Sequence, residues 1–129
     1  MPEAVLICHP QSPSSLVETI TVQFRHEAAR LWLRFAVEGR VDDILWPVEA
    51  GSARTDGLWN HTCFEAFVTT DEGYLEFNLS ASGQWATYRF DAYREGMRPA
   101  EETILIDGLD GGEDYLALEG WIDLPADAG

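Results

Sequence analysis

The stretch 59–97, WNHTCFEAFVTTDEGYLEFNLSASGQWATYRFDAYREGM, decides the fold because three short runs within it alternate between apolar and polar side chains. The runs are CFEAFVT (63–69), YLEFNLS (74–80) and QWATYRF (84–90). Side chains two positions apart on a β-strand lie on the same face, so this period predicts strands with one buried face. The links DEG and SASG between the runs are typical of tight turns. We therefore predict three consecutive antiparallel strands.

The alternation also predicts a polar face on this sheet. If the aliphatic and most of the aromatic side chains point inward, one set of polar and aromatic side chains points outward together: Glu65, Tyr74, Glu76, Asn78, Trp85, Thr87 and Arg89. Carboxylate, amide and guanidinium groups can bond sugar hydroxyls, and tryptophan can stack on a sugar ring. The predicted ligand-binding residues are therefore Trp59, Glu65, Glu76, Asn78, Trp85 and Arg89. The alternative is a solvated face on which Arg89 pairs with one of the two glutamates.

The rest of the chain predicts more short strands. Residues 20–24 and 31–37 alternate in the same way and suggest a hairpin; the rival interpretation is a helix over 26–39. Further strands are expected at 4–8, 103–107 and 115–124, with an irregular segment at 39–57, a helical turn or excursion at 91–99 and the acidic turn DGLDGGED at 107–114. About seven short strands with hardly any helix predict an antiparallel β-sandwich, and 129 residues predict a single domain over 1–129.

Composition narrows the classes of partner. The net charge is −15, with eight arginines and no lysine, so the chain repels nucleic acids and anionic membranes, and we expect neither as a partner. The absence of lysine excludes Schiff-base and P-loop chemistry. The N-terminus lacks the basic start and long apolar run of a signal peptide, which predicts a cytoplasmic protein. Cys8 and Cys63 are then expected to be free thiols.

Four segments together resemble the bacterial DOMON-like family: WNHTCFEAF (59–67), GYLEFN (73–78), SGQWATYRF (82–90) and YREGM (93–97). That family is similar to DOMON domains and to family 9 carbohydrate-binding modules. The resemblance implies an immunoglobulin-like or jelly-roll β-sandwich whose relatives bind sugars or haem. Such relatives tend to run longer, with another strand or two and a His-bearing tail, so the sandwich formed by these 129 residues is expected to lack C-terminal strands of the family.

The residue types are compatible with three other kinds of site. Glu65 and Glu76 on adjacent strands could form the carboxylate pair of a glycosidase. The acidic side chains Asp107, Asp110, Glu113 and Asp114 suit Ca²⁺ in kind but not in spacing. Haem would need an axial ligand, for which His9, His26, His61 and Met97 are the candidates. No catalytic motif is present, so we expect no enzyme, no cofactor and no metal.

The sequence therefore predicts a non-catalytic module that binds a carbohydrate or another small polar ligand through the three central strands. The alternative is an interaction or scaffold domain that forms a homodimer, through an uncovered sheet edge or a flat aromatic face, without a small ligand.

Overall fold

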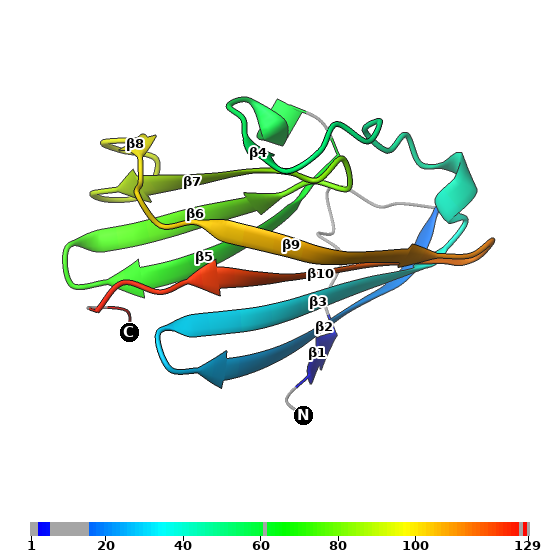
Figure 1. Cartoon of the computed structure of the whole chain (residues 1–129), viewed down its shortest axis with the longest axis horizontal. Coiled ribbons are helices and arrows are strands. Elements are labelled where there is room, and N and C mark those ends of the chain that lie inside the picture. Colours follow the sequence, from blue (N-terminus) through cyan, green and yellow to red (C-terminus); the bar gives the residue numbers. More distant parts are fainter. Residues whose placement is uncertain (1–2, 6–15, 61, 127, 129) are drawn as a thin grey trace.

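The computed structural model describes residues 3–5, 16–60, 62–126 and 128, and these form a β-sandwich of two sheets (Figure 1). Sheet A has the strand order β1-β2-β3-β10-β9, and sheet B has the order β4-β7-β6-β5, with β8 beside β7. The predicted all-β sandwich is thus confirmed; every strand pair is antiparallel except β4 with β7. The strands are β1 (Glu3–Val5), β2 (Val17–Glu27), β3 (Arg30–Gly39), β4 (Ala53–Arg54), β5 (Phe64–Thr70), β6 (Gly73–Leu79), β7 (Gln84–Phe90), β8 (Arg98–Pro99), β9 (Ile104–Gly111) and β10 (Tyr115–Asp123).

The main core lies between the two sheets. Sheet A contributes Leu33, Phe35, Leu118 and Ile122, and sheet B contributes the β6 residues Leu75, Phe77 and Leu79. The rings of Phe35 and Phe64 stack across the layers with centroids 4.9 Å apart. Each such side chain contributes about 1.5–3 kcal/mol by leaving water. The period-two pattern of the sequence is therefore the pattern of burial in these strands.

The first hairpin is formed by β2 and β3, so the strand interpretation of 20–37 is confirmed and the helix over 26–39 is wrong. Both strands are longer than predicted, and they turn at Ala28, whose φ of 53° lies in the left-handed region. The structure also differs from the prediction at the hairpin formed by β9 and β10. β9 continues to Gly111, so most of the acidic segment predicted as a turn belongs to a strand.

The two irregular segments contain only short elements. Residues 39–57 hold the 3₁₀ turn η1 (Val41–Asp43) and β4, and residues 91–99 form an excursion that returns as β8. A second 3₁₀ turn, η2 (Leu58–Asn60), precedes β5. The predicted strand 4–8 corresponds to β1 at its start, while Cys8, His9 and His61 lie outside the described residues.

A second apolar cluster lies on the outer face of sheet B, away from sheet A. Leu58 of η2 packs there against Ala86, Tyr88 and Phe90 of β7, with Tyr74 at the margin. Both faces of β7 are therefore covered: one by the main core and the other by η2. This cluster fixes η2, and with it Trp59, above the outer face of sheet B.

Candidate functional site

Strand register places the predicted glutamates and asparagine on the outer face of sheet B. Glu65 pairs with Asn78, and Phe67 pairs with Glu76, across β5 and β6. Paired residues of antiparallel strands point to the same side of the sheet. Continuing across β6 and β7, Glu76 pairs with Tyr88. The outer face thus has Glu76 at its centre, between an aromatic ring on each side.

The prediction that Trp85 and Arg89 share this face is wrong. Arg89 pairs with Leu75 and Trp85 pairs with Leu79, so both side chains lie on the core side of sheet B. The sequence assigned the wrong side chains of β7 to the core. Ala86, Tyr88 and Phe90 are the apolar set of this strand, and the apolar side chains of a strand normally face the main core. Here that set packs under η2 instead, which leaves Trp85, Thr87 and Arg89 to face sheet A.

Contacts near the edge of the sheet stabilise Trp85 and Arg89 on the core side of sheet B. The guanidinium carbon of Arg54 lies 4.6 Å from the centroid of the Trp85 ring, a cation–π contact. Arg89 Nη2 lies 3.5 Å from Oε2 of Glu102, whose side chain is almost buried. The alternative in which Arg89 pairs with Glu65 or Glu76 is therefore also wrong. Trp85 thus contacts β4 through Arg54, and Arg89 is tied to Glu102, which follows β8.

Asn78 is the most unusual side chain of the outer face. It has no solvent exposure, yet neither Oδ1 nor Nδ2 makes a hydrogen bond of ordinary geometry among the described residues, although the amide lies close enough to Glu76 to lower the pKa of that carboxyl in part. Leaving a buried amide without partners costs about 1–3 kcal/mol. Buried polar groups in native proteins are otherwise almost always bonded to protein or to ordered water. The amide of Asn78 therefore has unused bonding capacity just beneath the outer face of sheet B.

Glu76 lies next to this amide in an acidic, half-buried setting. Burial raises the pKa of Glu76, the charge of Glu65 raises it further, and the neighbouring Asn78 amide lowers it in part. A carboxyl with a raised pKa opposes folding once it ionises, so this contribution to stability is lost as the pH rises through that pKa. The charged form of Glu76 would gain from a positive partner.

Trp59 and Tyr88 form the aromatic margin of the face. Their rings meet edge to face with centroids 5.3 Å apart, and Trp59 remains 44 % exposed. The Tyr88 hydroxyl donates to Oδ1 of Asp56 at 2.8 Å. Burial first, and then this hydrogen bond, raise the pKa of Tyr88 to about 12, so the phenol stays protonated. The exposed part of the Trp59 ring is available for stacking.

A groove of 740 Å³ opens at the end of the same face. It is lined by Leu45, Trp46, Pro47, Val48, Asn60, Thr62 and Gln84. Gln84 has the same parity on β7 as Tyr88, and Asn60 belongs to η2, so the groove adjoins the row that contains Asn78. Thr62 Oγ1 donates to the carbonyl of Leu45 at 2.9 Å, which joins the two walls. A volume of this size accommodates a small ligand.

The reactivity of the Cys63 thiol depends on this acidic environment, which leads to a first prediction. Burial, followed by the charges of Glu65 and Glu76, raises the pKa of the Cys63 thiol from 9.0 to about 11. Only the thiolate reacts, so raising the thiol pKa from 9.0 to about 11 lowers the alkylation rate about 100-fold at neutral pH. In a Cys8→Ser background, iodoacetamide should modify Cys63 with a midpoint near pH 11. Adding Glu65→Gln should move that midpoint downward, and a midpoint at the ordinary thiol value would contradict the placement.

The chemical alternatives gain little support from the geometry. Within the described ranges, no three His, Cys, Asp or Glu side chains are grouped so as to hold a metal ion. Asp110, one of the predicted calcium ligands, accepts a hydrogen bond from Tyr115 at 3.2 Å. Glu65 and Glu76 are diagonal neighbours, because Glu65 faces Asn78 in the register. Diagonal neighbours lie about 7–8 Å apart, with their Cβ atoms somewhat closer, which is wider than a directly opposed pair.

Sequence reasoning missed several residues of the site, namely Asp56, Leu58, Cys63, Gln84 and Tyr88. Tyr88 was assigned to the core because its parity is apolar, and Asp56 is remote from the strands in sequence. The signal that could have shown the second cluster is Leu58, an apolar residue directly before Trp59.

None of the helical turns in the described residues has the length and apolar character needed to cross a membrane. In comparisons with known proteins, no family model, curated protein or solved structure matches this chain.

Proposed function

We propose that this protein is a non-catalytic module that binds a small polar ligand of the carbohydrate class on the outer face of sheet B. The observation that carries the proposal is Asn78, a fully buried amide that makes no hydrogen bond of ordinary geometry among the described residues and lies beside the half-buried carboxyl of Glu76. Such an amide lowers stability unless something bonds to it, and sites that hydrogen-bond a ligand accept that cost.

Recognition would use three kinds of group on one face. The amide of Asn78 and the carboxylate of Glu76 would bond hydroxyl groups, and the exposed ring of Trp59 would stack on the apolar side of a sugar ring. Glu65 and Gln84 stand at the margins as further hydrogen-bonding groups. The resemblance of residues 59–97 to the DOMON-like family, with its sugar-binding relatives, fits this proposal. For this chain we propose the cytoplasm.

Removing the stacking ring should weaken binding. Trp59→Ala is expected to lower the affinity for any sugar found on a glycan array about tenfold or more, because stacking contributes on the order of 1–2 kcal/mol. The matched control is Trp121→Ala, which removes a part-buried tryptophan from the opposite sheet. Calorimetry on both variants provides the measurement. Equal effects of the two substitutions, or a wild type that binds nothing, would end the proposal.

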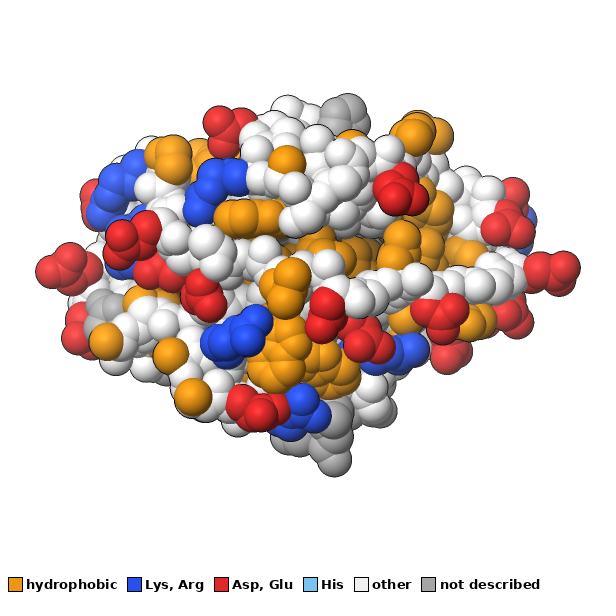
Figure 2. Space-filling model, in the orientation of Figure 1, with side chains coloured by type: hydrophobic (Ala, Val, Ile, Leu, Met, Phe, Trp, Pro, Cys, Tyr) orange, Lys and Arg blue, Asp and Glu red, His pale blue; other side chains and the backbone are white. Residues whose placement is uncertain are grey.

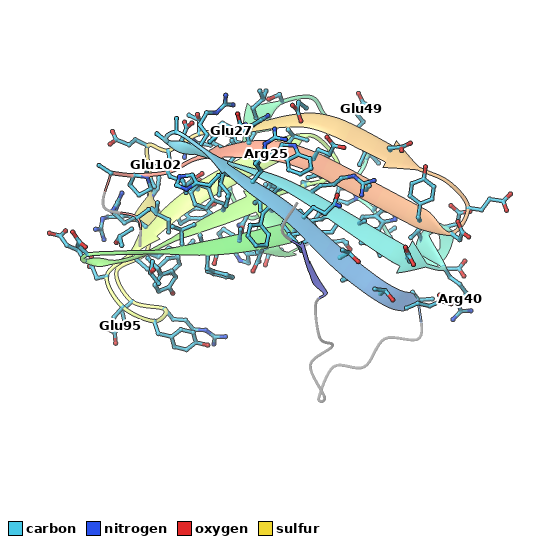
Figure 3. All side chains as sticks on the ribbon, turned by 90° about the horizontal axis from the view of Figure 1, so that it is seen from below. Arg25, Glu27, Arg40, Glu49, Glu95 and Glu102 are labelled. Carbon is cyan, nitrogen blue, oxygen red and sulfur yellow. The ribbon has the colours of Figure 1, made fainter. Side chains whose placement is uncertain are left out.

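A second candidate function is self-association through the outer face of sheet A. Trp32 and Trp121 are directly paired there, and the Arg25 guanidinium lies 5.4 and 5.5 Å from the two ring centroids. Figure 2 shows this side of the molecule, with hydrophobic surface bordered by arginine and acidic side chains. Figure 3 shows Arg25 and Glu27 together on β2, where they form an ion pair.

This second face is locally neutral despite the net charge of −15. Two further arginines of the face also pair with acids, Arg30 with Asp123 at 3.9 Å and Arg34 with Glu119 at 3.3 Å. A neutral aromatic surface would let two acidic chains meet without strong repulsion. Sedimentation analysis of the wild type and of Trp32→Ser distinguishes the candidates: a dimer lost in the variant favours this one, and a monomer in both excludes it.

A further inference from the structure

The outer face of sheet B is acidic and has no arginine partner among the described residues. Glu65 and Glu76 lie on it, and the Asp56 carboxylate reaches its margin through the hydrogen bond from Tyr88. None of the ion pairs found between described residues includes any of these three carboxylates. Their negative charge is therefore compensated by no arginine side chain that the structure describes.

Seven of the eight arginines are engaged elsewhere. They pair with acids other than Glu65, Glu76 and Asp56 or lie over aromatic rings: Arg25, Arg30, Arg34, Arg54, Arg89, Arg94 and Arg98. The inward orientation of Arg89 is decisive. Had it shared the face, it would have neutralised Glu76, and the face would have suited a neutral or anionic ligand.

The uncharged groups of the face favour a ring-bearing ligand with polar substituents. Asn78 offers an amide with both atoms unpartnered at zero exposure, directly across from Glu65 and two positions from Glu76. The exposed ring of Trp59 and the phenol of Tyr88 lie on the other side of Glu76. Aromatic faces attract cations as well as the C–H faces of sugars. Amide, aromatic ring and carboxylate thus converge around one position.

We infer that this face selects a cationic ligand, specifically an amino sugar whose protonated amine contacts Glu76 while its hydroxyl groups bond to Asn78. The inference rests on the proposed function and adds the charge of the ligand to it. A half-buried carboxylate pairs with an ammonium group more strongly than an exposed one, because water screens the attraction less. An N-acetylated or hydroxylated analogue offers no such charge.

A bare divalent cation is a poorer match for the same groups. Within the part of the chain that the structure describes, no cluster of three metal-ligating side chains exists, and the two glutamates are only diagonal neighbours. An aromatic ring and an amide beside the carboxyl are common in sites for organic ligands. The charge and shape therefore point to an organic ammonium.

The test compares three sugars that differ at one ring position: glucosamine, N-acetylglucosamine and glucose. Calorimetry at about pH 6 keeps the amine protonated. Wild type should bind glucosamine about tenfold or more tightly than the other two, and high salt should weaken only the glucosamine complex. Glu76→Gln should remove that preference, so that the variant binds glucosamine and glucose with affinities within about twofold of each other. Glu72→Gln, in the exposed turn between β5 and β6, is the matched control and should behave as wild type.

The pH dependence gives a second readout. The groups that face Glu76 are Glu65 and Cys63 from the β5 side, Tyr88 from β7 and Asp56 beside η2, all acidic, while His61 lies outside the described residues. Glucosamine affinity should fall as the pH drops and Glu76 is protonated, and glucose affinity should not. Equal affinity for all three sugars would overturn this inference and leave the proposed function standing. Binding of none of them, with a blank glycan array, would overturn both.

Discussion

Phe77→Ala should lower the free energy of unfolding by about 3–5 kcal/mol, the largest effect of any single change considered for this chain. Phe77 has no solvent exposure and lies at the centre of β6, among core residues of both sheets. Truncation removes the transfer energy of the ring and leaves a cavity that its neighbours can fill only in part. A loss of this size consumes a large share of the stability of an ordinary domain. Urea unfolding followed by tryptophan fluorescence measures it.

The matched control is Phe67→Ala on the neighbouring strand β5. Phe67 is 58 % exposed on the outer face, and its ring meets the Tyr74 ring edge to face with centroids 6.1 Å apart. Its loss should cost about 1 kcal/mol or less. Similar costs for the two phenylalanines would mean that the inner and outer faces of sheet B have been assigned incorrectly.

Asn78→Leu should stabilise the protein by about 1–3 kcal/mol and lower ligand affinity about 100-fold or more. Leucine has the same number and branching of side-chain heavy atoms as asparagine, so the space stays filled while the penalty of an unpartnered amide disappears. Thermal unfolding gives the stability change, and calorimetry with the best sugar from the array gives the affinity. A protein that is more stable and no longer binds is the expected result for a residue that a site requires.

Thr87→Val provides the matched control for this effect. Thr87 is also fully buried and its Oγ1 also lacks a partner, but its side chain lies on the core side of sheet B, opposite Phe77 in the register. It should stabilise the protein in the same way and leave binding unchanged. If Asn78→Leu instead destabilises the fold, the amide has a structural partner, and the main support for the proposed function is lost.

The sequence predicted the sandwich well because strand formation here follows a local pattern. The alternation in β5 and β6 matches the side on which each residue is buried, and the Gly-containing turns between the strands are as expected. The same reasoning recovered β2, β3 and β10. The same reasoning predicted too short a strand for β9. The acidic and glycine residues after Ile106 are typical of turns, but here they lie in a strand at the exposed edge of sheet A, which tolerates them.

The candidate site was predicted only in part, and β7 is the reason. Glu65, Glu76, Asn78 and Trp59 do gather over one face, whereas Trp85 and Arg89 point the other way. A strand covered on both faces has no polar side, so its phase cannot be determined from alternation alone. What decides the phase is a contact distant in sequence, Leu58 against Ala86 and Phe90, and no local pattern encodes that contact.

Because β7 is covered on both faces, it also affects which parts of the protein unfold locally. A strand with neighbours bonded on both edges and side chains packed above and below exchanges its amide hydrogens only when the whole domain unfolds. Its central neighbour β6, which carries Glu76 and Asn78, is bonded to a strand on each edge, whereas β5 is the last strand of its sheet and can fray alone. Hydrogen exchange should therefore be slowest in β6 and β7, and a bound ligand should slow exchange chiefly in β5. Most of the recognition surface is rigid before any ligand arrives, so little conformational entropy remains to be lost on binding.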